Sequence, residues 1–120
     1  MAAHNELGKE GELMALNYLK GKGYQLLETN FRWGKQEIDI IALDKDQIVI
    51  AEVKTRTSNT FAEPEANVNL QKQKFLIRAA NGYVVKNRIP YEVRFDIISI
   101  LMAGAKSEIN HIENAFSPSW

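Results

Sequence analysis

Two neighbouring apolar runs constrain the fold of this chain more than any other feature. Residues 37–43 read EIDIIAL and residues 47–54 read QIVIAEVK, with the polar segment DKD between them. Both runs are rich in β-branched residues, and a short Asp-containing break between such runs is typical of a β-hairpin. We therefore expect two antiparallel strands joined by a two-residue turn at Lys45 and Asp46.

This hairpin predicts a cluster of polar side chains at the open end of the two strands. A two-residue turn places Asp39 directly opposite Glu52, and in the same register Glu37 lies opposite Lys54. Directly opposed residues share one face of a sheet, with side chains about 5 Å apart. A slip of one residue would move Asp39 and Glu52 to opposite faces, so the cluster requires an even loop length.

Two carboxylates at this separation repel each other unless a proton or a cation lies between them. Mg²⁺ or Mn²⁺ suits such a pair, because these ions take oxygen ligands and need few protein carboxylates when a substrate phosphate also binds. Lys54, on the same face, would orient a water molecule or stabilise charge on the phosphate. The pattern therefore favours metal-assisted phosphodiester hydrolysis. The alternative, which the spacing alone supports equally well, is a pair of strand-end salt bridges without chemistry.

The rest of the chain supplies the other elements of an α/β fold. In chain order we expect a helix over about residues 5–22, a strand over 24–32, the hairpin, a second helix over about 68–83 and a strand over 91–100. The polar stretch at 55–67 contains a proline and is expected to be a loop. The order αβββαβ predicts a mixed sheet flanked by helices, with a parallel last strand because its connection is long.

Composition limits the class of protein. A chain of 120 residues with 45% hydrophobic and 25% charged residues is expected to form one domain over residues 1–120, with a core at about 5–101. Residues 102–120 are expected to form a tail or a short helix. No apolar run approaches the roughly 20 residues of a membrane span, and no signal-peptide pattern is present. We therefore expect a cytoplasmic protein without a membrane partner.

Charge and cysteine content narrow the chemistry further. There are no cysteines, so disulfides and thiolate metal sites are excluded. The formal net charge is zero, which excludes a strong, sequence-independent nucleic-acid binder that relies on many phosphate contacts. Any contact with nucleic acid must come from a local patch.

Two further residues lie on helix faces that look buried. Glu12 lies beside Gly8 and Gly11 on the first helix, and we expect it to face the carboxylate cluster as a ligand of the metal or its water. The alternative is that Glu12 reaches past the glycines to solvent or caps a neighbouring element. Lys72 lies on the apolar stripe of the second helix, where lysines usually extend to the surface. Its alternative role is to bind a phosphate or a carboxylate in the site.

Substrate contacts are expected from a few cationic and amide side chains. Arg32 would hold a phosphate while Trp33 stacks on a base, unless Trp33 covers the sheet edge and Arg32 is solvated. Arg56 would bind the neighbouring phosphate. Gln73, next to Lys72, is included because its amide can pair with a backbone or base edge.

These residues also carry a resemblance to a known family. The motifs are GKEGE at 8–12, NFR at 30–32, EIDII at 37–41, EVKTR at 52–56, KQ at 72–73 and RFD at 94–96. In this order, over about residues 8–100, they resemble the YraN family, small bacterial proteins assigned to the restriction-endonuclease-like, PD-(D/E)XK fold. The resemblance implies an αβββαβ core, with Asp39, Glu52 and Lys54 in the positions of the nuclease signature. Archaeal Holliday-junction resolvases are similar in layout, and their first-helix glutamate maps onto Glu12.

Together, the residues and the resemblance lead to two functional hypotheses. The first is a Mg²⁺- or Mn²⁺-dependent endonuclease acting on DNA, including structured or branched DNA. Asp39, Glu52 and Glu12 would bind the metal, Lys54 would assist catalysis and Glu37 would be peripheral. The alternative is a non-catalytic nucleic-acid-binding or protein-interaction module on the same fold. A homodimer would help so small a nuclease to span two strands.

Overall fold

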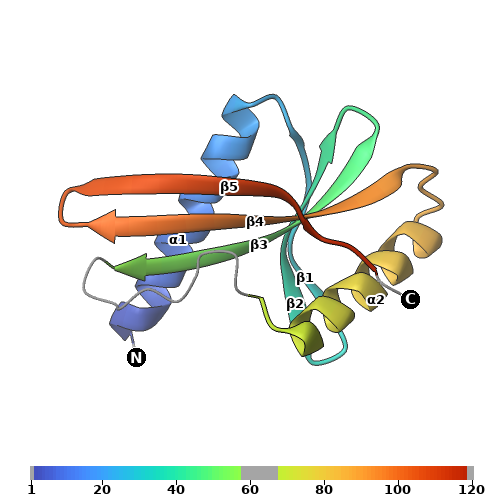
Figure 1. Cartoon of the computed structure of the whole chain (residues 1–120), viewed down its shortest axis with the longest axis horizontal. Helices are drawn as coiled ribbons and strands as arrows, with labels where there is room; N and C mark the ends of the chain where they lie inside the picture. The colour runs from blue at the N-terminus through green and yellow to red at the C-terminus, as the bar shows by residue number, and fades with distance from the viewer. Residues whose placement is uncertain (1, 58–67, 119–120) are drawn as a thin grey trace.

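The computed structural model describes residues 2–57 and 68–118. Within them the chain forms one five-stranded sheet with helices α1 and α2 on its two faces (Figure 1). The elements are α1 Ala2–Gly21, β1 Gln25–Trp33, β2 Gln36–Asp44, β3 Gln47–Thr57, α2 Leu70–Lys86, β4 Glu92–Ala103 and β5 Lys106–Phe116. The predicted αβββαβ order is confirmed, and the arrangement is compatible with a restriction-endonuclease-like core.

The strands follow one another across the sheet in the order β1-β2-β3-β4-β5. Strands β3 and β4 are parallel because the chain crosses over through α2, and the other neighbours are antiparallel. The predicted hairpin is confirmed, since Asp44 pairs with Gln47 around a turn at Lys45 and Asp46.

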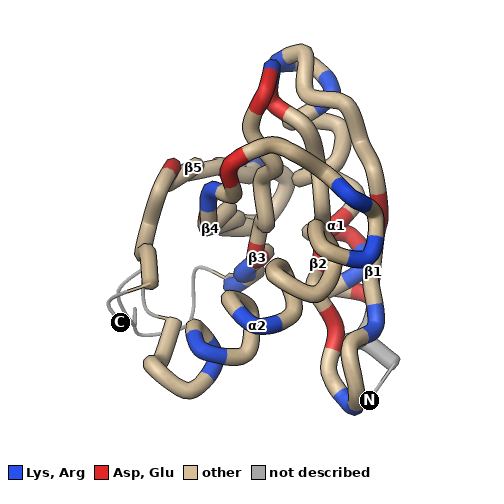
Figure 2. Tube along the Cα trace, turned by 90° about the vertical axis from the view of Figure 1, so that its right-hand side faces the viewer, with Lys and Arg blue, Asp and Glu red and all other residues tan. Residues whose placement is uncertain are grey.

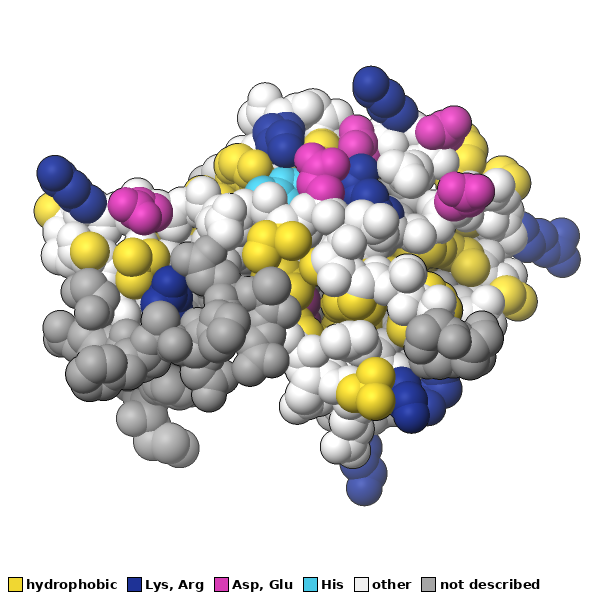
Figure 3. Space-filling model, in the orientation of Figure 1, with side chains coloured by type: hydrophobic (Ala, Val, Ile, Leu, Met, Phe, Trp, Pro, Cys, Tyr) yellow, Lys and Arg dark blue, Asp and Glu magenta, His cyan; other side chains and the backbone are white. Residues whose placement is uncertain are grey.

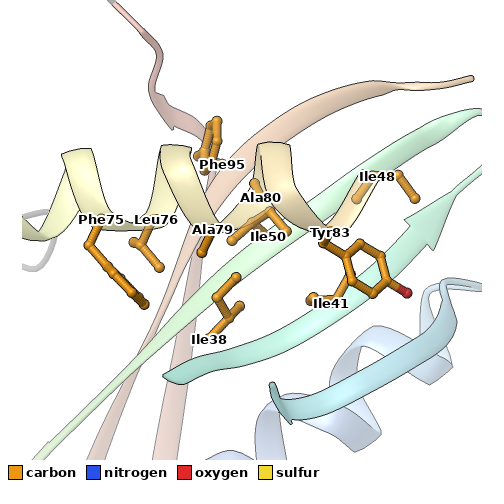
Figure 4. Close-up of a cluster of buried hydrophobic side chains, with 10 residues drawn as sticks. All are labelled: Ile38, Ile41, Ile48, Ile50, Phe75, Leu76, Ala79, Ala80, Tyr83 and Phe95. Carbon is orange, nitrogen blue, oxygen red and sulfur yellow. The ribbon is translucent and has the colours of Figure 1, made fainter. Parts of the chain in front are cut away.

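The two faces of the central strands are both buried. The side chains of β3 alternate between the two faces of the sheet. Ile48 and Ile50 pack toward α2, whereas Val49 and Ala51 pack toward α1. Figure 4 shows the α2 side, where aliphatic side chains of β2 and β3 meet one stripe of the helix. Burial on both faces explains why the two hairpin runs are almost continuously apolar.

The C-terminal segment corrects the sequence-based expectation. Residues 102–120 were expected to be a tail or a short helix, but Lys106–Phe116 form β5, which pairs antiparallel with β4. The expected core boundary near residue 101 is therefore too early. The pattern was misleading because β5 is an edge strand whose residues are largely polar and exposed, and because Asn114 has a left-handed backbone (φ 52°) where the pairing is irregular.

A buried polar network holds β5 in place. Arg94 Nε and Nη2 each donate to the Asp96 carboxylate at 2.9 Å, and the Asn114 backbone N–H donates to it at 3.0 Å. His111 Nε2 lies 2.7 Å from the same carboxylate. Arg94 also donates to the Tyr24 hydroxyl at 2.7 Å, which connects β4 and β5 to the start of β1. Figure 3 shows acidic and basic side chains gathered around a histidine on this face of the molecule.

Two further sequence-based expectations concern the polar stretch and the membrane. Strand β3 extends to Thr57, into the stretch expected to be a loop, and residues 58–67 of that stretch lie outside the described residues. Neither helix of the described chain combines the length and the apolar character needed to cross a bilayer.

Candidate functional site

The candidate site lies where the sheet opens into a fork. The pairing of β2 with β3 runs from Asp44–Gln47 to Ile40–Ala51. Beyond that last pair, β2 continues alongside β1, and β3 continues alongside β4 as far as Thr57. The two halves of the sheet diverge from this point (Figure 1). The next residue on each strand is one of the predicted metal ligands, Asp39 on β2 and Glu52 on β3.

Asp39 takes part in forming the fork. Its Oδ2 accepts a hydrogen bond of 2.8 Å from the backbone N–H of Val53 on β3. A side chain therefore contacts the β3 backbone just past the last pair of the β2–β3 ladder. The predicted register is correct for the pairs that form. However, the ladder ends at Ile40–Ala51, so neither of the two expected pairs, Asp39 with Glu52 and Glu37 with Lys54, forms as a ladder pair. Glu37 pairs with Arg32 on the other side of β2.

The alternation of β2 also changes at this point. Strict alternation along β2 would place Ile38 on the same face as Ile40, but Ile38 packs in the cluster on the α2 side together with Ile41. Ile40 packs on the α1 side as expected from its neighbour Ala42. The change coincides with the separation of β2 from β3. Side chains from both helices reach the carboxylates at the fork, Glu12 from α1 and Lys72 from α2.

Glu52 and Asp39 are brought together and withdrawn from solvent. The Glu52 side chain is 13% exposed, and its burial, followed by the nearby charge of Asp39, raises its pKa to about 7. Burial likewise raises the pKa of Asp39. Each of the two carboxyl groups affects the pKa of the other through a hydrogen bond between them, so a proton or a cation is needed where both come together. The oxygen Glu52 Oε1 is buried, and no N–H or O–H group of the described residues donates to it.

Two lysines place positive charge beside Glu52. Lys72 reaches it from α2, with Nζ 3.6 Å from Glu52 Oε2 and 5.7 Å from the centre of the Phe75 ring. Lys54, two residues along β3, is half-buried, and its charge acts to lower the pKa of Glu52. Acidic and basic residues thus meet where β2, β3 and α2 come together (Figure 2). Of the two alternatives for Lys72, the geometry shows a carboxylate partner rather than a fully solvated lysine.

Glu12 reaches the site from the other face. Helix α1 packs closely on β3 at Gly11, where an added Cβ would collide with the Thr55 side chain. Glu12 follows Gly11 and accepts a hydrogen bond of 3.1 Å from Asn30 Nδ2. Burial, opposed by this hydrogen bond and assisted by the charges of Asp39 and Glu37, raises the pKa of Glu12.

Glu12, Asp39 and Glu52 open onto one cavity. It has a volume of about 280 Å³ and is lined by Leu7, Gly8, Glu12, Asp39, Glu52, Val53 and Thr55. A water molecule occupies about 30 Å³ of the liquid, so the cavity has room for an ion with several waters. Among residues 2–57 and 68–118, no three acidic or histidine side chains converge closely enough to enclose an ion by themselves. A hexacoordinate Mg²⁺ does not need three, because it retains waters and binds through one or two carboxylates.

The predicted substrate contacts are less closely grouped. Arg32 is exposed on β1, and Arg56 is half-buried on β3. Trp33 packs against α2 at Gly82, where a Cβ would collide with its ring, and it stacks on Phe31. This is the alternative in which Trp33 covers the sheet rather than a base.

The remaining predicted contact, Gln73, forms a hydrogen bond with the segment that precedes its own helix. Its Nε2 donates to the Val68 carbonyl at 2.8 Å, and so it holds the segment that leads into α2. This is the backbone pairing that its amide was expected to offer as one of two alternatives.

Sequence reasoning missed two residues that position the site. Asn30 orients Glu12, and its left-handed backbone (φ 50°) is a conformation that asparagine tolerates better than most residues. Asn69 caps α2, since its Oδ1 accepts from the Lys72 backbone N–H at 2.8 Å. An asparagine immediately before the helical stripe is a recognisable cap signal, whereas the contact of Asn30 with Glu12 has none.

Comparisons with known proteins place the chain among similar sequences. Residues 11–100 match the family model described as "Uncharacterised protein family UPF0102". A UPF0102 protein of Thermodesulfovibrio yellowstonii is 51% identical over 114 residues, covering 95% of this chain and 98% of the relative. UPF0102 proteins of Christiangramia forsetii and Bacteroides thetaiotaomicron are each 46% identical, over 97% and 98% of this chain and 98% of each relative.

Proposed function

Since the chain belongs to the uncharacterised protein family UPF0102, the YraN family that its motifs resemble, we propose a function from the site itself: metal-dependent hydrolysis of phosphodiester bonds in DNA. The observation that carries the proposal is the buried oxygen Glu52 Oε1, which lies beside a second carboxyl group without a donor. An acceptor in this position is satisfied by a proton or by a cation.

The donor set supports a hard divalent ion. Asp39 and Glu52 offer carboxylate oxygens, and the cavity that they line leaves space for water and phosphate oxygens. There is no cysteine in the chain, and among the described residues no histidine lines the cavity, so the available ligands match Mg²⁺ or Mn²⁺ better than softer metals. The chemistry supplied by such an ion is charge neutralisation on the phosphate and a lower pKa for a bound water.

The protein residues then have distinct roles. Asp39 and Glu52 hold the ion, while the bond from Asn30 keeps Glu12 at the rim of the cavity, where it can orient water. Lys54 places a positive charge next to Glu52 and would stabilise the negative charge that develops on the phosphate. Arg32 and Arg56 are the proposed contacts to neighbouring phosphates. The choice of DNA as substrate is supported by the fold resemblance alone.

A nuclease assay with matched variants tests the proposal. Purified protein with Mg²⁺ or Mn²⁺ is incubated with linear, nicked, branched and single-stranded DNA, and cleavage is followed on gels. We expect cleavage that falls by about 10²-fold or more in Asp39→Ala and Lys54→Ala. Cleavage by Glu12→Gln is expected to fall about 10-fold, because the proposed role of Glu12 is to orient water rather than to bind the ion by itself.

Glu10→Gln provides the control, because Glu10 is an exposed residue of the same helix. It should cleave like the parent. Equal cleavage by Asp39→Ala and the parent would remove the catalytic assignment.

The Lys72–Glu52 ion pair favours a second candidate, a non-catalytic binding module whose polar cluster is structural. Calorimetry separates the two. A metal site binds Mn²⁺ and loses that binding in Glu52→Ala, whereas a purely structural ion pair shows no Mn²⁺ binding in either protein.

A further inference from the structure

We propose that Lys72 is the resident cation of the metal-free site, and that it competes with the divalent ion for the Glu52 carboxylate. This inference rests on the proposed function and adds to it a control of metal binding. It assigns Lys72 a role opposite to that of a metal-site helper: its ammonium group must leave Glu52 before the ion binds fully.

The geometry places the ammonium group where it can be exchanged. Lys72 Nζ lies 3.6 Å from Glu52 Oε2, beyond the 2.7–2.9 Å of a tight charge-assisted hydrogen bond. The Lys72 side chain is 30% exposed, whereas that of Glu52 is 13% exposed. Glu52 is therefore the more buried partner, while the ammonium group of Lys72 is carried on a flexible, partly exposed side chain. Lysine suits this exchange because its ammonium group is a compact charge. Unlike the planar guanidinium group of arginine, it does not hold a carboxylate through two fixed hydrogen bonds.

The start of α2 keeps Lys72 available at this position. Asn69 caps the helix through the backbone N–H of Lys72 itself, and Gln73 holds the preceding residue Val68. The Phe75 ring, with its centre 5.7 Å from Nζ, provides an apolar and aromatic surface beside the ammonium group. These contacts fix the backbone of Lys72 but leave its side chain able to turn away from Glu52.

The electrostatics of the site require competition. The ammonium group of Lys72 forms an ion pair with Glu52, a carboxylate that would hold the ion. The same charge that stabilises the carboxylates would repel a divalent ion bound to them, because like charges a few ångströms apart interact strongly in a poorly solvated site. Neutralising Lys72 should therefore strengthen metal binding as long as both carboxylates are ionised.

The exchange would also order the events at the site. When Glu52 is occupied by an ion, the ammonium group of Lys72 is released next to the same cavity wall. The ammonium group can then bind a substrate phosphate, which it is less able to do while it is paired with Glu52. Lys72 would thus contact phosphate only after the metal has bound.

Calorimetric titration of Mn²⁺ into metal-free protein at about pH 8 tests the competition directly. We expect Lys72→Met to bind Mn²⁺ about 10-fold more tightly than the parent. Lys72→Arg keeps the charge and should stay close to the parent. Lys74→Met is the matched control, because Lys74 is an exposed residue of the same helix, and its affinity should not change.

Thermal unfolding gives a second readout and reports whether each variant is folded. Lys72→Met should melt at a lower temperature than the parent without metal, because it leaves Glu52 without its cation, and it should gain more from added Mn²⁺. Lys72→Gln repeats the test with a polar side chain. Unchanged or weaker Mn²⁺ binding in both variants overturns the competition and leaves the metal site standing. If neither the parent nor Lys72→Met binds Mn²⁺, both this inference and the proposed metal site are wrong.

Discussion

At the fork, burial of acidic residues opposes their ionisation. Glu52 is a carboxyl group that burial and a neighbouring acid keep from ionising freely. Such groups are common at functional sites, where burial and a neighbouring like charge shift pKa values. This opposition to ionisation has a measurable consequence for stability.

The ionisation of Glu52 should destabilise the metal-free protein. Its pKa rises from 4.5 to about 7 on folding, so between these values the folded state holds more protons than the unfolded state. The stability contribution is therefore complete below about pH 4.5 and is lost as pH rises through about 7. At about pH 8 in chelator, we expect Glu52→Gln to be more stable than the parent by roughly 1–3 kcal/mol. Urea unfolding measures the difference.

That difference should disappear near pH 4, where Glu52 is protonated in both states. An advantage of Glu52→Gln that is independent of pH would show that shape or hydrogen bonding, and not ionisation, is responsible.

Asp96 behaves in the opposite way. Burial alone would raise its pKa, but hydrogen bonds from His111, Arg94 and the Asn114 N–H lower it below the usual 3.8. The stability contribution of its ionised form is present above about pH 4 and is lost as pH falls through the lower folded pKa. Asp96→Asn leaves the buried Arg94 without its main counter-charge and should cost about 3–5 kcal/mol at neutral pH. Urea unfolding should show this cost shrinking below about pH 3.

At the scale of elements, the packing of α1 on β3 determines where Glu12 lies. Gly11 allows the helix to approach Thr55, and a methyl group at this position would collide with that side chain. Gly11→Ala should therefore lift the helix, lose about 1–3 kcal/mol and weaken the hydrogen bond from Asn30 to Glu12. Thermal unfolding and Mn²⁺ calorimetry measure the two effects.

Helix α1 also contains a glycine at which substitution by alanine should have the opposite effect on stability. An added Cβ at Gly8 meets no atom within 4 Å. Gly8→Ala should stabilise α1 by about 0.5–1 kcal/mol, because alanine is a better helix former than glycine. Destabilisation by both substitutions to the same extent would contradict the proposed close contact at Gly11.

At the scale of the whole molecule, we expect folding to depend on β5, which pairs with β4 and contacts Asp96. A chain that stops at Met102 keeps every element of the expected αβββαβ core. It nevertheless loses the His111 and Asn114 contacts of Asp96 and leaves β4 as an exposed edge. We expect this truncated chain to show no cooperative thermal transition by circular dichroism. A truncated chain that melts cooperatively near the parent temperature would restore the earlier core boundary.

The sequence by itself determined the features that depend on neighbouring residues. The hairpin turn, the register from Asp44–Gln47 to Ile40–Ala51, the order of the first six elements and the closeness of Asp39 to Glu52 follow from side-chain periodicity and one turn, and the structure agrees with each. Family membership is likewise carried by short motifs, and the comparisons confirm it.

Only the tertiary structure decided the rest. The point at which β2 leaves β3, the approach of Lys72 to Glu52 and the pairing of β5 with β4 all join segments far apart in the chain. A periodic pattern reports which face of an element is buried, but it does not say against what or where two strands separate. These contacts depend on the summed packing of both helices on the sheet. For this reason the sequence left two alternatives open for Lys72, and only the tertiary structure showed that it approaches Glu52.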